Sequence, residues 1–238
     1  MEISYTRYRI YRECPWKYKL LFVDGRKIPM TPKSSFGLSV HRALEVWLLG
    51  GELSLETLHE ALRSRWLGAG YPDKDTEARW YSKAERALSR FYGEEESRRA
   101  RTVCVEKEFL FASGAHQIRG KIDRIDQGPD GAYEIIDYKT GPGVPTVEQV
   151  AKDLQMRFYA LGAQRGLHLP RPETLTVDCV VAGERISAPY DGAGEDLLDA
   201  DVRAAASGIE AQAFTPDTRY CPRCDFRKDC PYSAAKEP

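Results

Sequence analysis

The feature that most constrains the fold is a change in the spacing of hydrophobic residues near position 102. Before it, apolar residues recur every three or four positions, as in Leu55, Leu58 and Leu62, which is the period of an amphipathic helix. From Thr102 onward the period falls to two, which is typical of strands with one buried face. The chain therefore predicts helices first and a sheet afterwards, and so an α/β fold.

Three strands are expected in succession as an antiparallel meander, then a long helix, two more strands and a last helix. The ranges are 103–111, 117–126 and 133–139 for the first strands, 146–161 for the helix, 174–181 and 185–190 for the later strands, and 195–213 for the last helix. This order predicts a mixed sheet flanked by helices, with a helical insertion at 50–100 before a sheet core at 102–190. At 238 residues the chain suits a single decorated domain, 1–238.

No apolar run approaches the roughly 18 residues that span a bilayer, so no membrane association is expected. Residues 1–7 lack an apolar signal region, which favours a cytoplasmic location.

Two acids and a lysine lie on neighbouring expected strands. Asp137 and Lys139 are two residues apart, so their side chains share a face. If Asp123 lies opposite Asp137, the two carboxylates can hold a hard divalent cation such as Mg²⁺ or Mn²⁺. Lys139 could then position a water molecule or neutralise charge on a phosphate. Seen alone, a D-x-K sequence is more often a surface ion pair.

The register of the hairpin decides whether the acids meet. Pairing Gln127 with Tyr133 sets Asp123 opposite Asp137, whereas a loop one residue shorter sets Asp123 opposite Ile136 on the other face. Because a shared cation requires both acids on one face, we expect the first register or a compensating bulge.

Three further polar residues lie on expected helices. His41 follows Gly37 by one helical turn, and its imidazole could complete a metal shell, although a lone helical histidine is more often a packing residue. Gln155 and Tyr159 share a helix face and could contact a phosphate or a base.

In this order, the G-x-x-x-H, G-x-x-D, D-x-K and Q-x-x-x-Y motifs resemble the RecB-like branch of the PD-(D/E)XK nuclease superfamily. The resemblance implies that His41, Asp123 and Asp137 bind Mg²⁺ or Mn²⁺ and that Lys139 is catalytic. It also implies that Gln155 and Tyr159 contact DNA. The proline of the family name is absent, and the third motif carries an aspartate instead of a glutamate; both departures are common in this branch.

Four outlying cysteines suggest a second metal site. Cys221, Cys224 and Cys230 form a C-x2-C-x5-C pattern, and Cys14 is the candidate fourth ligand. Zinc and an iron-sulfur cluster both accept four thiolates. The pattern is similar to that of the iron-sulfur nucleases of this branch, including AddB-type and CRISPR-associated RecB-like exonucleases, which implies a 4Fe-4S cluster joining segments 1–36 and 214–238. Cys104 and Cys179 are expected in the core.

A DNA-binding face must be local, because 35 basic and 36 acidic residues nearly cancel. Residues 1–33 carry eight basic and three acidic side chains, interleaved with aromatic residues, a composition suited to single strands. Arg7 and Arg12 are the best candidates for phosphate contacts, while the tyrosines between them also fit a helix core stripe.

The sequence thus favours a metal-dependent DNA nuclease, expected to be an exonuclease on single-stranded or end-containing DNA in repair, recombination or CRISPR spacer acquisition. One alternative is a catalytically weak nuclease-fold module that binds DNA for a helicase or integrase. Another is a zinc-stapled protein-interaction domain. The sequence does not determine the polarity of cleavage, the pathway or the oligomeric state.

Overall fold

The computed structural model describes residues 1–235, which form two compact units. Unit 1 comprises residues 1–28, 110–120 and 194–235, and unit 2 comprises residues 29–109 and 121–193. Two strands, β2 (Arg101–Ser113) and β3 (His116–Gln127), contribute residues to both units. Unit 2 holds the acidic, histidine and Q-x-x-x-Y motifs, and unit 1 holds the four cysteines expected to bind a cluster.

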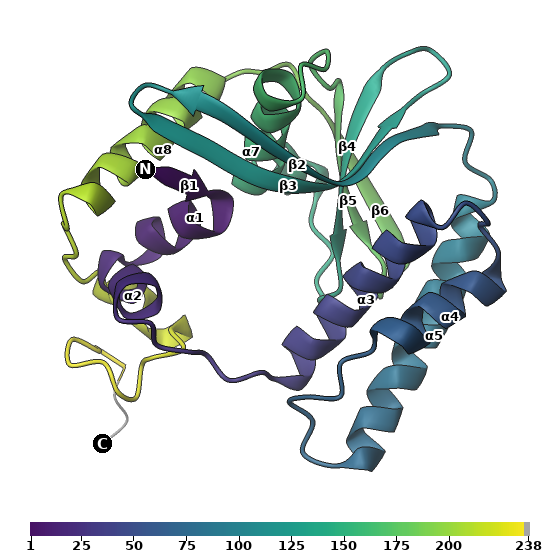
Figure 1. Cartoon of the computed structure of the whole chain (residues 1–238), viewed down its shortest axis with the longest axis horizontal. Coiled ribbons are helices and arrows are strands. Elements are labelled where there is room, and N and C mark those ends of the chain that lie inside the picture. Colours follow the sequence, from purple (N-terminus) through teal and green to yellow (C-terminus); the bar gives the residue numbers. More distant parts are fainter. Residues whose placement is uncertain (236–238) are drawn as a thin grey trace. The chain divides into compact units, whose positions relative to one another are not determined.

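Unit 2 begins with three helices and continues with strands and shorter helices (Figure 1). They are α3 (Pro32–Leu49), α4 (Leu55–Arg65), α5 (Lys74–Glu95), β4 (Tyr133–Lys139), α6 (Val147–Ala151), α7 (Leu154–Leu161), the π-helical turn η2 (Gly162–Gly166), β5 (Thr174–Cys179) and β6 (Glu184–Pro189). Strand β4 is antiparallel to β3 and parallel to β5, and β5 is antiparallel to β6. A six-stranded mixed sheet with flanking helices confirms the expected α/β fold.

Local chemistry explains where the three long helices begin. Thr31 and Ser54 each close a capping box with the residue three positions on, and the side chain of Asp73 accepts a hydrogen bond from the backbone of Thr76. Gly50 ends α3, as its position after the apolar run predicts.

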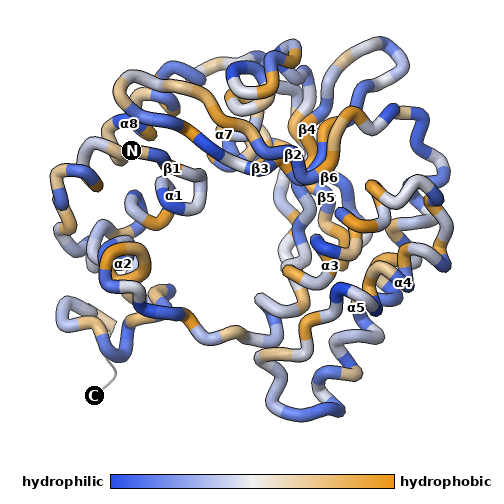
Figure 2. Tube along the Cα trace, viewed as in Figure 1, coloured by the Kyte–Doolittle hydropathy of each residue, from blue (hydrophilic) through white to orange (hydrophobic). Residues whose placement is uncertain are grey.

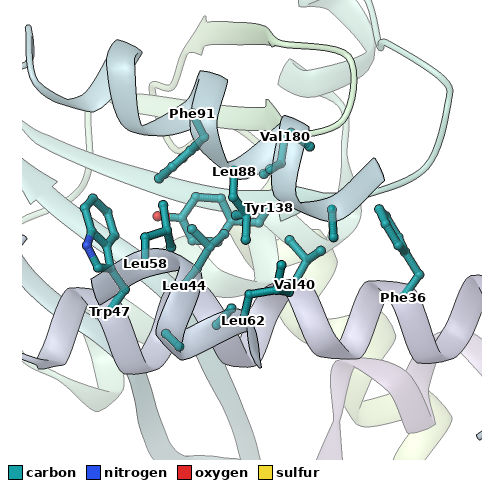
Figure 3. Packing of buried hydrophobic residues seen from close by; sticks show 14 of the residues in the cluster. Phe36, Val40, Leu44, Trp47, Leu58, Leu62, Leu88, Phe91, Tyr138 and Val180 are labelled. Atoms are coloured by element: carbon teal, nitrogen blue, oxygen red, sulfur yellow. The ribbon is translucent and has the colours of Figure 1, made fainter. Parts of the chain in front are cut away.

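The core of unit 2 lies between these helices and β4. Phe36, Val40, Leu44 and Trp47 of α3 pack with side chains of α4 and α5 and with Tyr138 of β4 (Figure 3). Hydrophobic and hydrophilic residues interleave along α3, as its two faces require (Figure 2). Because neighbours on a strand point to opposite faces, Tyr138 in the core leaves Asp137 and Lys139 on the other face of β4.

The single helix expected over 146–161 is wrong, since two helices occupy this range. Helix α6 ends at Ala151, and α7 starts anew after Asp153, whose carboxylate accepts hydrogen bonds from the backbone nitrogens of Gln155 (2.7 Å) and Met156 (3.1 Å). An aspartate in this role starts a helix in a new direction, which hydrophobic spacing alone does not reveal.

Unit 1 contains a short strand that the sequence did not predict. Its elements are β1 (Glu2–Ser4), α1 (Tyr5–Glu13), α2 (Pro15–Tyr18), the π-helical turn η1 (Lys19–Val23), α8 (Glu195–Glu210) and the 3₁₀ helix η3 (Thr218–Arg223). Strand β1 pairs in parallel with β3, with Ile3 opposite Ile118. Of the helices in residues 1–235, none has both the length and the apolar composition needed to cross a bilayer.

Candidate metal centre and cysteine cavity

The hairpin of β3 and β4 has the register that brings the acids together. Gln127 pairs with Tyr133 and Arg124 with Ile136, so this register, continued by one residue past the end of the ladder, sets Asp123 opposite Asp137. The predicted register is therefore confirmed, and it follows from the five-residue connection 128–132. Asp123 also accepts a hydrogen bond from the backbone nitrogen of Tyr138 at 3.0 Å, which joins it to β4 directly.

Asp137 has a buried carboxylate that pairs with Lys139. The residue is 1% exposed, and its Oδ2 atom lies 2.6 Å from Nζ of Lys139. A carboxylate oxygen has two lone pairs, so pairing with one ammonium leaves room for a further partner. A divalent cation is such a partner.

His41, on helix α3, lies next to Asp123. Its Nδ1 atom is 3.4 Å from Oδ2 of Asp123. Burial, and then the nearby Lys139 ammonium, lower the pKa of His41 to about 4, so the imidazole is neutral and keeps a lone pair at neutral pH. Burial, and then repulsion from Asp137, raise the pKa of Asp123 well above its usual range. The His41 imidazole and the Asp123 carboxylate thus each have lone pairs that a divalent cation could bind.

The glycine one turn before His41 has a steric role. A methyl group at Gly37 would lie 3.0 Å from Oγ1 of Thr140, the residue that follows Lys139. The missing side chain lets α3 approach the end of β4, which brings His41 to the acids.

Lys139 is held by the Q-x-x-x-Y motif. Its Nζ donates a hydrogen bond to Gln155 Oε1 at 2.9 Å, and Gln155 Nε2 donates to the Tyr159 hydroxyl at 2.8 Å. Burial opposes the charged form of Lys139, but the carboxylate of Asp137 outweighs it and raises the lysine pKa. The ammonium form is thus favoured, and a group in this form supplies positive charge and does not accept a proton.

Glu106 is a member of the site that the sequence analysis missed. One donor atom each from His41, Glu106 and Asp123 lie within 4.8 Å of one another, a spacing that suits a shared cation. Glu106 lies inside β2 with a φ of 47°, a left-handed conformation that costs a non-glycine residue about 1–3 kcal/mol. Glu106 falls at a polar position of the strand alternation, so no pattern in the sequence distinguished it from a surface residue.

Next to Asp123, a buried network fixes the strand. Arg124 donates to Asp126 Oδ1 and Glu95 Oε2, both at 2.6 Å, and to the Tyr138 hydroxyl at 3.3 Å. Two acids and a hydroxyl accept hydrogen bonds from this buried guanidinium, which thereby links β3 to β4 and α5. A shift in the register of β3 around Asp123 would break several charged hydrogen bonds.

The four expected cluster cysteines line one cavity of about 270 Å³ in unit 1. Cys14 accepts a hydrogen bond from the backbone nitrogen of Asp217 at 3.3 Å. Among residues 1–235, no three of the cysteine sulfurs lie within 4.8 Å of one another. Trp16 also lines the cavity, and its Nε1 is buried without an acceptor. The other two cysteines are free, Cys179 in the core as expected and Cys104 only half-buried.

The two arginines expected to meet phosphates are partly engaged within unit 1. Arg12 forms an ion pair with Asp201 at 2.9 Å and donates to the Tyr8 hydroxyl at 3.1 Å. The Arg7 guanidinium lies 5.0 Å from the centre of the Phe22 ring. Arg7 thus keeps more of its charge available than Arg12 does.

A scan of family models gives a match to the PD-(D/E)XK nuclease superfamily over residues 2–231. The chain belongs to this superfamily. Members are phosphodiesterase nucleases that use divalent metal ions, and the fold implies DNA binding. This PD-(D/E)XK chain is also similar to a solved structure titled "Crystal structure of SSO0001", with 17% identity, a TM-score of 0.38, and coverage of 93% of this chain and 96% of that chain. No curated protein matches this PD-(D/E)XK chain.

Proposed function

We propose that this protein is a divalent-metal-dependent deoxyribonuclease, an exonuclease that acts on single-stranded or end-containing DNA. The observation that carries the proposal is the buried Asp137 carboxylate paired with Lys139, with Asp123 and His41 beside it. A surface ion pair would need neither a second buried acid nor a neutral imidazole beside it.

Each residue of the centre has a separate task. His41, Asp123 and Asp137 would hold Mg²⁺ or Mn²⁺ as neutral imidazole and carboxylate donors. When bound, such a cation polarises a phosphoryl oxygen and lowers the pKa of bound water. Lys139 presents a fixed positive charge to the charge that develops on the phosphate. Gln155 and Tyr159 hold the lysine in place and present the remaining polar atoms of their helix face to DNA, while Arg7 and Arg12 contact phosphates elsewhere on the strand.

Degradation of end-labelled DNA tests this proposal. With Mn²⁺ present, linear single strands should be shortened progressively and single-stranded circles should survive, and Asp137→Ala should lose the activity. Cutting of circles would replace the exonuclease assignment by an endonuclease. Cation-independent DNA binding without cleavage by the unaltered protein would favour the alternative of a binding module that serves a helicase or integrase.

We further propose that Cys14, Cys221, Cys224 and Cys230 hold a 4Fe-4S cluster. Four thiolates around one zinc ion lie about 3.8 Å apart, since each Zn–S bond is about 2.3 Å long. The cavity that all four cysteines line has room for a larger inorganic group. The orphaned Trp16 Nε1 is a donor that a cluster sulfide would satisfy. Zinc remains the alternative, and an iron and zinc analysis separates the two.

The wider role that we propose rests on the motif resemblance. We assign the chain to the RecB-like branch, working in DNA repair, recombination or CRISPR spacer acquisition beside a helicase or an integrase. The family match spans both units, which supports treating 1–238 as one nuclease domain, with cluster-binding edges at 1–36 and 214–238, an insertion at 50–100 and a catalytic core at 102–190. All six cysteines lie outside disulfides, which agrees with the proposed cytoplasmic location.

A further inference from the structure

Glu106 reaches the metal centre from a strand that carries none of the motif residues. The residue belongs to β2, whereas Asp123 belongs to β3 and His41 to α3. One donor atom from each of these three residues lies within 4.8 Å of the other two. Three elements that are far apart in the sequence therefore present nitrogen and oxygen donors to one point.

The contacts of Glu106 leave part of its carboxylate available. Its Oε2 atom lies 2.7 Å from Nζ of Lys121, and Lys121 also contacts Glu45 at 3.3 Å. The Glu106 side chain is 13% exposed, while that of Lys121 is 43% exposed. A carboxylate has two oxygens and about four acceptor directions, so an ion pair with one lysine does not exhaust it.

A plain ion pair with Lys121 explains Glu106 incompletely. Such a pair could form at the surface without bringing the carboxylate close to His41 and Asp123. The observed position puts three groups with negative charge or a lone pair, Glu106 included, around one point. Asp137, on the neighbouring strand β4, is a further acid of the centre and pairs with Lys139 at 2.6 Å. A positive charge between Glu106 and Asp123 would stabilise two carboxylates held this close.

We propose that Glu106 is an additional ligand of the catalytic cation, with one carboxylate oxygen toward the cation and the other held by Lys121. This inference rests on the proposed nuclease function and extends its metal shell from three side chains to four. Lys121 and Glu45 are then positioning residues, which fix the orientation of Glu106 and contact neither the cation nor the DNA.

Titration calorimetry with Mn²⁺ alone, on the full-length protein without DNA, tests the proposal. Glu106→Gln keeps the size of the side chain and removes the charge, and Glu106→Asp keeps the charge and shortens the reach. Both should weaken Mn²⁺ binding by at least about 10- to 100-fold, since changes to the outer-shell partners of metal ligands already cost that much. Glu108→Gln removes the same charge from an exposed position of the same strand and should leave the affinity unchanged. Asp137→Asn serves as the reference for loss of a ligand.

The outcomes separate the inference from the proposed function. Unchanged affinity in both Glu106 variants, with weak binding by Asp137→Asn, would overturn the role of Glu106 and leave the nuclease centre standing. Weak binding by Glu106→Gln with full affinity in Glu106→Asp would show that only long-range charge matters, which also overturns ligation. Absence of Mn²⁺ binding in the unaltered protein would remove the proposed function itself. Should Glu106→Gln fold poorly, the Glu106→Asp comparison still decides between reach and charge.

Discussion

At the scale of single residues, the centre combines two buried acids, Asp123 and Asp137, with the ammonium group of Lys139. Lys139 touches Asp137 and Gln155, and the carboxylates keep it charged. The D-x-K and G-x-x-D patterns predicted these groups because strand alternation and hairpin length fix which side chains meet. Glu106 escaped prediction because it falls at a polar position of the strand alternation, and its left-handed backbone conformation leaves no periodic trace in the sequence.

Separate roles for the acids and the lysine predict different losses on substitution. Lys139→Ala should leave Mn²⁺ affinity largely intact, because the ammonium does not ligate the cation, and should reduce cleavage by about 100- to 1000-fold. Asp123→Ala should lose both properties. Calorimetry beside a cleavage assay distinguishes them, and equal losses of metal affinity in the two variants would contradict these roles.

The raised pKa of Asp123 predicts a pH dependence for the cation-free protein. Because the folded state keeps a proton on Asp123 that the unfolded chain releases near its usual pKa of 3.8, stability is greatest below that pH and falls as the pH rises through the higher folded value. Mn²⁺ displaces the proton, and His41 stays neutral because its pKa is about 4. The Mn²⁺-induced rise in Tm should therefore be larger at about pH 8 than at about pH 5. A rise that is independent of pH would speak against ligation by Asp123.

At the scale of elements, the sequence predicted the β3–β4 hairpin well and the region after it less well. A hairpin depends on neighbouring residues, so turn length and alternation determine it. The division of 146–161 into α6 and α7 depends on Asp153, whose side chain starts α7 and so sets the direction of Gln155. Strand β1 was missed because three residues are too few for a period, and its partner lies more than a hundred residues away.

The cap of α7 should matter to both stability and catalysis. Asp153→Ala should reduce the free energy of unfolding by about 1 kcal/mol, the usual cost of losing such a cap, and should reduce cleavage because Gln155 then holds Lys139 less firmly. Asp153→Asn keeps the capping acceptor and removes the charge. If denaturation with urea gives the same loss for both variants, the charge of Asp153 and not its cap is responsible.

At the scale of the whole molecule, the cysteine cavity is lined by chain segments that are about 200 residues apart in the sequence. A crosslink that closes a loop of this length stabilises a protein by about 5 kcal/mol. Anaerobically purified protein should be brown and contain iron approaching four atoms per chain. Cys14→Ser should bleach the colour and lower Tm, because it removes a ligand that ties the first segment of unit 1 to the last.

Cys104→Ser and Cys179→Ser are the matched controls, since neither cysteine lines the cavity, and both should keep the colour. A colourless protein with one zinc ion per chain would refute the iron assignment and keep the crosslink. Colour that survives Cys14→Ser would remove that residue from the site.

The division of unit 1 into three stretches of sequence has a consequence for synthesis on the ribosome. Unit 2 is complete once residue 193 has emerged, whereas unit 1 must wait for residues 194–235, which carry three of its four cysteines. Domains fold as their residues become available, so a nascent chain stalled with residue 193 outside the exit tunnel should already protect unit 2 from protease. Residues 1–28 should still be cleaved at that stage, and their protection before the tail emerges would contradict this order. The nuclease centre would thus be assembled before any cluster could be loaded.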